Sequence, residues 1–236
     1  MQKFLLLSFL FTIAISSSQE IEEDSMLFSE ALELYLDDYN QQADIALQNG
    51  NLEYAKNLFD TLVSNHLENT YLDKLNFEGY KNFLSSTDDF DKPTIILTYT
   101  SWCIPSKGEI PALNALANKY SDLMNFVVLY WDKKEVVKAM AKQFDQCIDI
   151  VYVDERQNKH MQTINLLKNA LGLQLCFVLS ASGEILDINR RPPNYLNDSE
   201  EDSLARNVSF ISEQVAAVYL DLNININDLP ESLVTF

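Results

Sequence analysis

Short apolar segments that alternate with amphipathic ones constrain this chain most, and they fill its central part. β-Branched and aromatic residues favour strands at 94–99, 126–131, 148–153, 175–179 and 184–188. Apolar residues at helical spacing favour helices at 107–121, 133–144, 161–171 and about 199–220. Strands that alternate with helices pair in parallel, whereas the last two strands are joined by a short turn and form a hairpin. The sequence therefore predicts an α/β fold with a mixed, mainly parallel sheet flanked by helices.

The region before this block is predicted to be an all-helical extension. Apolar residues recur at helical spacing within 26–86, and Asn49-Gly50 is a favourable turn between two helices. A helical hairpin of this size has little core of its own, so we expect it to pack against the α/β domain. A polar segment that ends at Pro93 predicts the boundary between the two parts.

The first residues have the pattern of a signal peptide. Lys3 supplies a positive charge, residues 4–15 are apolar, and three serines offer small side chains for cleavage. The apolar run is shorter than the roughly 20 residues that cross a bilayer, so we expect no stable membrane insertion after cleavage. The predicted divisions are a signal peptide at 1–18, a helical region at 19–90 and an α/β domain with a C-terminal helix at 91–236.

Charge and composition exclude several kinds of ligand. The chain has 17 Lys and Arg against 35 Asp and Glu, for a net charge of −18, which repels nucleic acid and anionic lipid. The 2 histidines and 3 cysteines lack metal-ligand spacing, so no metal or other cofactor is predicted. In the oxidising environment of an exported protein, an odd number of cysteines leaves at least one thiol free or paired with another chain.

Cys103 is the candidate reactive residue. The sequence Trp102-Cys103-Ile104-Pro105-Ser106 follows the first predicted strand and precedes a predicted helix. A cysteine at a helix N-terminus lies near free backbone N–H groups and the positive end of the helix dipole, and both favour the thiolate. Ser106 cannot act as a second thiol that resolves a mixed disulfide, so we expect it to donate a hydrogen bond to the Cys103 thiolate.

This strand, Trp-Cys-x-Pro and helix resemble the thioredoxin family, and within it the exported TlpA-like branch of Gram-negative bacteria. The resemblance covers Asp91–Asn189. It implies a thioredoxin-like fold, a periplasmic location with secretion as the alternative, and a part in cell redox homeostasis. Its partners would be the thiols or disulfides of exported proteins. Trp102 would form one wall of the groove beside Cys103, Ile104 and Pro105 would shape the turn, and Lys107 would lie in the first helical turn.

Three positions depart from the family pattern. The second cysteine of the motif is replaced by Ser106, and Leu97 stands where thioredoxins have a buried acid. Gln174 stands where the family has a cis-proline facing the cysteine. Because a cis bond before a non-proline residue costs roughly 3–4 kcal/mol, we expect a trans bond there. Together the departures predict reduced or altered dithiol exchange.

The other cysteines and a pair of arginines have two interpretations each. Cys176 either supplies a replacement resolving thiol or fills the core as a small apolar residue, and the second is favoured. Cys147 is interpreted as structural. Arg190-Arg191 follows the last strand and could bind an anion, but a surface turn is favoured.

Three functions remain open. The first is thiol–disulfide exchange through Cys103 alone, as a monothiol oxidoreductase. The second is a redox-inactive thioredoxin-fold module that binds an exported client. The third, ranked below them, is a peroxidase with a single cysteine, since Thr100 has the spacing of the peroxiredoxin threonine.

Overall fold

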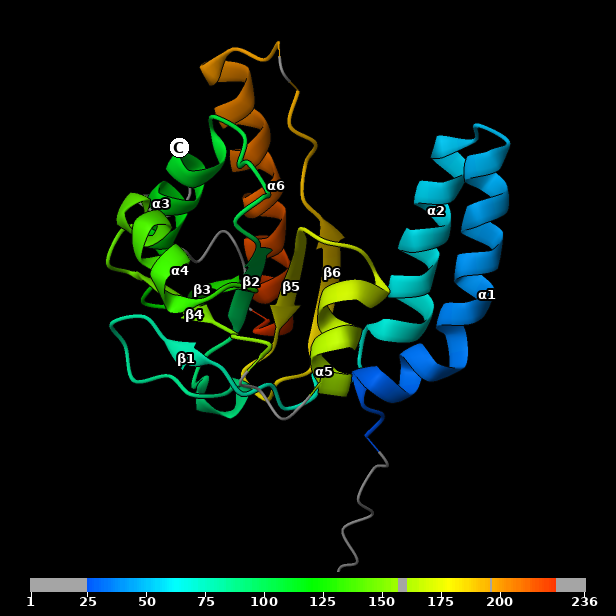
Figure 1. The fold of residues 1–236 in the computed structure, drawn as a ribbon, viewed down its shortest axis with the longest axis horizontal. Helices are drawn as coiled ribbons and strands as arrows, with labels where there is room; N and C mark the ends of the chain where they lie inside the picture. The colour runs from blue at the N-terminus through cyan, green and yellow to red at the C-terminus, as the bar shows by residue number, and fades with distance from the viewer. Residues whose placement is uncertain (1–24, 157–160, 196, 224–236) are drawn as a thin grey trace, which may run out of the picture.

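The computed structural model describes residues 25–156, 161–195 and 197–223 (Figure 1). The predicted signal peptide at 1–18 lies outside these residues. So do the last 13 residues of the predicted α/β domain, 224–236.

One mixed sheet organises the described chain, with strand order β1-β4-β3-β2-β5-β6 (Figure 1). Its strands are β1 (Glu78–Gly79), β2 (Thr94–Tyr99), β3 (Asn125–Tyr130), β4 (Ile148–Tyr152), β5 (Leu175–Leu179) and β6 (Ile185–Arg190). β2, β3 and β4 run parallel, whereas β1, β5 and β6 pair antiparallel with their neighbours. This confirms the predicted thioredoxin-like α/β fold. The sequence predicted a mainly parallel sheet, but parallel pairing is confined to β2, β3 and β4. The parallel part is smaller because β1 and the β5–β6 hairpin add antiparallel pairs.

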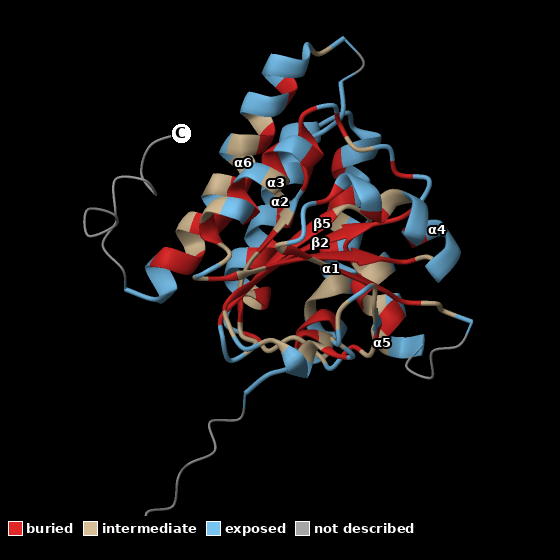
Figure 2. Ribbon diagram, turned by 90° about the vertical axis from the view of Figure 1, so that its left-hand side faces the viewer, coloured by how far each residue is buried: buried red, intermediate tan, exposed pale blue. Residues whose placement is uncertain are grey.

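Helices cover both faces of the sheet, and Figure 2 shows the buried strands between the helical layers. The helices of the α/β part are α3 (Glu109–Tyr120), α4 (Lys134–Met140), α5 (Met161–Asn165) and α6 (Glu200–Asp221). A short 3₁₀ turn at Ala141–Gln143 follows α4, and a π-helical turn at Leu166–Ala170 continues α5.

Two apolar clusters, one on each face of the sheet, form the core. On β2, Ile95, Leu97 and Tyr99 belong to the cluster that also contains residues of α3 and α6. Ile96 belongs to the other cluster, which contains residues of the N-terminal helices and α5. Every residue of β2 is buried. That is the reason its sequence is mostly apolar and does not alternate regularly between apolar and polar residues, although it contains the buried Thr94 and Thr98.

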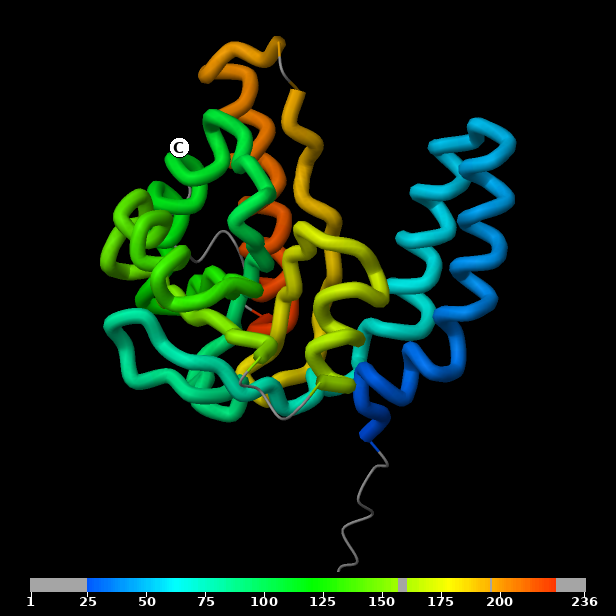
Figure 3. Tube along the Cα trace, in the orientation of Figure 1, coloured from blue at the N-terminus to red at the C-terminus, as the bar shows by residue number. Residues whose placement is uncertain are grey.

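The N-terminal helices form a hairpin beside the β6 edge of the sheet, which is easiest to follow in Figure 3. α1 (Phe28–Gln48) and α2 (Leu52–Leu62) are joined at Gly50, whose φ of 71° suits a residue without a side chain. A π-helical turn at Val63–Leu67 extends α2.

The hairpin shares the core of the sheet. The Phe28 ring lies edge-on to that of Phe177 on β5, with centroids 5.9 Å apart. Arg190 at the end of β6 donates from Nη2 to the Tyr39 hydroxyl at 2.8 Å and lies 4.1 Å above the Phe59 ring. Arg190 is therefore part of a helix–sheet interface, where the sequence favoured a surface turn.

The helical prediction for 26–86 is wrong beyond Leu67. The chain continues in an irregular path whose backbone bonds to the sheet, and it contributes β1. The backbone N–H of Asn69 donates to the Ile185 carbonyl at 2.9 Å, and that of Tyr80 donates to the Ile150 carbonyl at 2.7 Å. Partners distant in sequence satisfy this backbone, and local periodicity cannot reveal them.

Candidate functional site

The loop of residues 100–108, at the carboxyl end of the central strand β2, carries the candidate site. β2 ends at Tyr99, and α3 begins at Glu109. Cys103 is 5% exposed. The Asp132 carboxylate, after β3, accepts hydrogen bonds from the Ser101 backbone N–H at 2.6 Å and from its hydroxyl at 2.8 Å. The loop is therefore attached to the neighbouring strand just before the cysteine.

Thr100 is the hydrogen-bond partner of the Cys103 sulfur. Its Oγ1 donates to Sγ at 2.8 Å, and the Cys103 backbone N–H donates to the Thr100 carbonyl at 3.0 Å. Thr100 is 1% exposed. The two contacts form a tight turn that holds the sulfur against a buried hydroxyl.

The structure does not support the predicted stabilisation of Cys103 by a helix N-terminus. α3 begins six residues after the cysteine, and groups other than the sulfur accept hydrogen bonds from the amides at its start. The Ser106 N–H donates to the Glu109 carboxylate at 3.2 Å, and the Gly108 N–H donates to the Ser203 hydroxyl at 2.9 Å. The dipole argument requires the cysteine within the first turn, because the effect falls off beyond it.

Ser106 is attached to α6 and not to the cysteine. Its hydroxyl accepts a hydrogen bond from Nδ2 of Asn207 at 2.8 Å, and both residues are buried. The same Nδ2 donates to the Ser203 carbonyl at 2.7 Å. Within the described chain, no hydrogen bond joins the Ser106 hydroxyl to Cys103 Sγ, where the sequence predicted that Ser106 donates to the thiolate. The reason is the position of α6, which packs on α3 and the loop before it.

A buried ion pair lies at the start of α3. The Glu109 carboxylate pairs with the Arg191 guanidinium and also accepts a hydrogen bond from the Tyr99 hydroxyl. The guanidinium lies 3.9 Å above the Tyr99 ring, and burial raises the pKa of Tyr99 to about 12. Arg191 is 7% exposed, so the favoured interpretation of Arg190-Arg191 as a surface turn is wrong. An arginine directly after the last strand and a glutamate in the first helical turn were the available sequence signals.

Gln174 lies in the left-handed region of backbone conformation, with φ of 70°, and the described residues contain no cis peptide bond. Its carbonyl accepts a hydrogen bond from the Arg191 N–H at 3.0 Å. The next residue, Leu175, exchanges backbone hydrogen bonds with the Thr98 hydroxyl at 2.9 and 3.2 Å. The loop that would face the cysteine in the family is thus held by Thr98 and Arg191.

The other two cysteines lie in different environments. Cys176 is fully buried on β5 opposite Leu97, in the cluster beneath α3 and α6, and burial raises the pKa of its thiol. Cys147 is half-buried just before β4, and the pKa of its thiol is also raised, chiefly by burial. All three cysteines are free thiols.

Two apolar side chains of the loop are exposed at the surface. Trp102 is 67% exposed and Ile104 77%, whereas Pro105 is half-buried. Nδ2 of Asn194 donates to the Ile104 carbonyl at 3.4 Å. The next residue, Tyr195, is exposed, and its ring lies 4.9 Å from the Arg206 guanidinium of α6. We call Trp102, Ile104 and Tyr195 the apolar rim. Lys107 donates to the Asp198 carbonyl at 3.3 Å, so its ammonium points to the segment before α6 and not to the sulfur.

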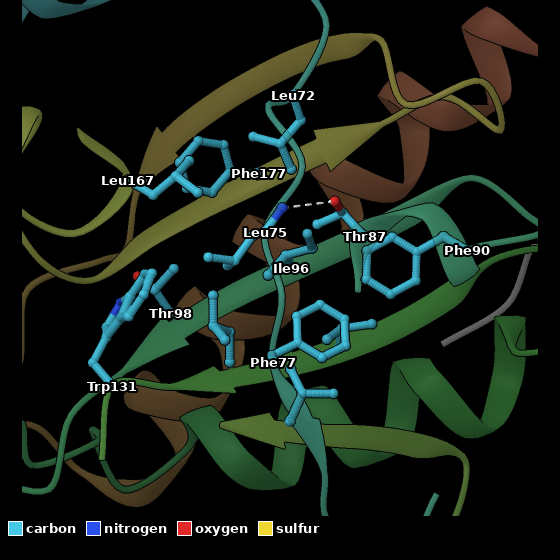
Figure 4. Close-up of a pocket in the computed structure, with 13 residues that line it drawn as sticks. Leu72, Leu75, Phe77, Thr87, Phe90, Ile96, Thr98, Trp131, Leu167 and Phe177 are labelled. Carbon is cyan, nitrogen blue, oxygen red and sulfur yellow. Dashed lines mark hydrogen bonds between the residues drawn. The ribbon is translucent and has the colours of Figure 1, made fainter. Parts of the chain in front are cut away.

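A small cavity on the opposite face of the sheet does not extend the site. Figure 4 shows apolar side chains converging on it, with a hydrogen bond from the Leu75 N–H to the Thr87 hydroxyl at 3.1 Å. Its volume of about 10 Å³ is at the lower limit of the space that one water molecule needs. Among the described residues, no group of three or more His, Cys, Asp and Glu side chains could hold a metal ion. No described helix has the length and apolar character needed to span a membrane.

Comparison with known proteins finds similar structures only. No protein-family model matches this sequence, and no curated protein matches it. Similar solved structures include the thioredoxin domain of a thiol-disulfide oxidoreductase from Bacteroides vulgatus, with 14% identity, a TM-score of 0.47, and 61% of this chain and 94% of that chain covered. A putative thiol:disulfide interchange protein DsbE from Chlorobium tepidum has 19% identity and a TM-score of 0.43, with 62% and 96% covered. StoA from Bacillus subtilis has 17% identity and a TM-score of 0.42, with 61% and 96% covered. At these identities the likeness concerns the fold alone.

Proposed function

We propose that this chain is an exported, TlpA-like member of the thioredoxin superfamily that carries out thiol–disulfide exchange through Cys103 alone. The observation that carries the proposal is the pairing of Cys103 with Thr100 at the end of the central strand, beneath an exposed apolar rim. Cys147 and Cys176 are poorer candidates, because burial raises the pKa of each thiol and lowers the fraction of reactive thiolate at neutral pH.

The chemistry is one disulfide exchange. The Cys103 thiolate attacks one sulfur of a client disulfide, a mixed disulfide forms, and the second client sulfur leaves as a thiolate that takes up a proton. Ser106 has no thiol to release the client, and its hydroxyl is held by Asn207. A second thiol, from the client or from a small molecule, must attack the mixed disulfide and restore Cys103. The mixed disulfide should therefore be long-lived.

Client recognition would use the apolar rim. Trp102 and Ile104 flank the cysteine in sequence, and Tyr195 directly follows Asn194, which contacts the loop. Exposed aromatic side chains supply large contact area at low cost in conformational entropy. We infer a client with an apolar segment beside its disulfide. The periplasm of a Gram-negative bacterium is the location that fits this chemistry, since disulfides persist in oxidising compartments.

Trapping of the mixed disulfide tests the proposal. The protein is incubated with oxidised glutathione, quenched with acid and mapped by mass spectrometry without reduction. We expect glutathione on Cys103, loss of the adduct in Cys103→Ser, and no change in Cys147→Ser. A folded protein that acquires no adduct at Cys103, while its urea-unfolded form does, would contradict the proposal.

A redox-inactive binding module is the second candidate. The low exposure of Cys103 favours it, because the sulfur must be reached by the disulfide that it attacks. If this candidate is correct, a client captured by the protein resists elution by reductant, and Cys103→Ser binds it as well as the unmodified protein does. Capture that depends on Cys103 and is released by reductant supports exchange.

A further inference from the structure

We propose that Thr100 is a positioning residue whose hydroxyl stabilises the Cys103 thiolate and so sets the reactivity of the site. This inference rests on the proposed thiol chemistry at Cys103. Thr100 directly follows the last residue of β2, and its side chain is excluded from solvent, since the residue is 1% exposed.

The hydrogen bond has only one direction in the thiolate state. A thiolate carries no proton, so the Thr100 hydroxyl must donate and the sulfur accept. The Oγ1 to Sγ distance is 2.8 Å, and the backbone hydrogen bond from Cys103 to Thr100 holds both residues in place. Because Thr100 is buried, water cannot replace its hydroxyl at this position.

Three other donors of the loop that follows Cys103 are engaged elsewhere. The amide of Ser106 donates to Glu109, and that of Gly108 donates to Ser203. The Lys107 ammonium donates to the Asp198 carbonyl. Thr100 is thus the side-chain donor that the structure assigns to Cys103, in place of the predicted helix N-terminus and Ser106.

Charged groups of the neighbouring elements also contribute to the electrostatic environment of this hydrogen bond. They are Asp132 after β3, Lys107 in the loop, and the paired Glu109 and Arg191. None contacts the Thr100 hydroxyl in the described structure, so a change of Thr100 leaves them in place. A hydrogen bond to a charged acceptor is stronger than a neutral one, so its loss selectively raises the free energy of the thiolate.

The test measures the rate at which iodoacetamide alkylates Cys103, followed by peptide mapping from about pH 5 to about pH 9. Thr100→Val removes the hydroxyl and keeps the β-branched shape. We expect the midpoint of its pH–rate profile to move to higher pH by about one pH unit or more. At pH values below this midpoint, alkylation of Cys103 should be about tenfold slower than in the unmodified protein. Thr100→Ser keeps a hydroxyl and should restore most of the rate. Thr94→Val is the matched control, because Thr94 is a buried threonine at the start of β2 and its hydroxyl donates to the Lys92 carbonyl.

An unchanged profile in folded Thr100→Val overturns the inference and leaves the proposed exchange standing. If Thr100→Val does not fold, Thr100→Ala and Thr100→Ser form the deciding pair, and equal profiles for these two overturn the inference. A different result would contradict the proposed function itself. Cys103 would then be alkylated no faster than Cys147 and would take up no glutathione, whatever residue stands at position 100.

Discussion

Loss of the buried ion pair should destabilise the protein strongly. The Glu109 and Arg191 side chains are 7% and 2% exposed, and the carboxylate also accepts hydrogen bonds from Tyr99 and Ser106. Arg191→Met leaves the Glu109 charge buried without its cation, which typically costs about 3–5 kcal/mol. Nε and Nη2 of Arg191 are buried without a hydrogen-bond partner in the described chain, so their removal relieves part of this cost. We therefore expect about 3 kcal/mol, out of a total stability on the order of 5–15 kcal/mol.

Urea unfolding followed by tryptophan fluorescence measures this loss. The set comprises Arg191→Met, Glu109→Gln and the double variant. The double variant should lose less than the sum of the two single changes, because neither charge then stays buried alone. Arg206→Met is the control, since its partner Asp198 forms a more exposed pair, and its effect should be far smaller. The reasoning is refuted if Arg191→Met shifts the unfolding midpoint no more than the control does, or if the single effects add.

Three further predictions follow from burial and close packing. Burial raises the pKa of Asp187, so the folded state favours the neutral carboxyl group. The folded state therefore loses stability as the pH rises from about 4 through this raised pKa. Asp187→Asn should raise the melting temperature at pH 7 and have little effect near pH 4. Gly108→Ala should cost about 1–3 kcal/mol in urea unfolding, because its Cβ would lie 2.1 Å from the backbone nitrogen of Leu204 on α6, and an unchanged midpoint would show that α6 can shift. In the folded protein at neutral pH a maleimide should label Cys147 slowly and Cys176 not at all, since burial raises both thiol pKa values, and fast labelling of Cys176 would contradict its place in the core.

Much of the sheet could be predicted because its signals are local. The strand predicted at 94–99 is β2, and the one predicted at 175–179 is β5. The other predicted strands agree with the structure to within two residues at each end. Burial on both faces of β2 and β5 favours mostly apolar, β-branched and aromatic residues without alternation, and this shows directly in the sequence. The motif around Cys103 could likewise be placed at the end of a strand.

The partners of the site residues could not be predicted. Ser106 meets Asn207 across 101 positions of sequence, and Glu109 after β2 pairs with Arg191 after β6. The irregular path after Leu67 was missed for the same reason, since its backbone bonds to β4 and β6.

The sequence by itself determined the alternating elements, the position of Cys103 after the central strand, and the absence of a second thiol at position 106. These follow from residue identity and short-range periodicity. Only the tertiary structure decided which groups contact the cysteine. Chain folding brought α6 onto Ser106 and the end of β6 onto Glu109, and the turn after β2 placed the Thr100 hydroxyl against the sulfur. Such contacts depend on three-dimensional packing, in which residues far apart in sequence compete for the same buried donors and acceptors.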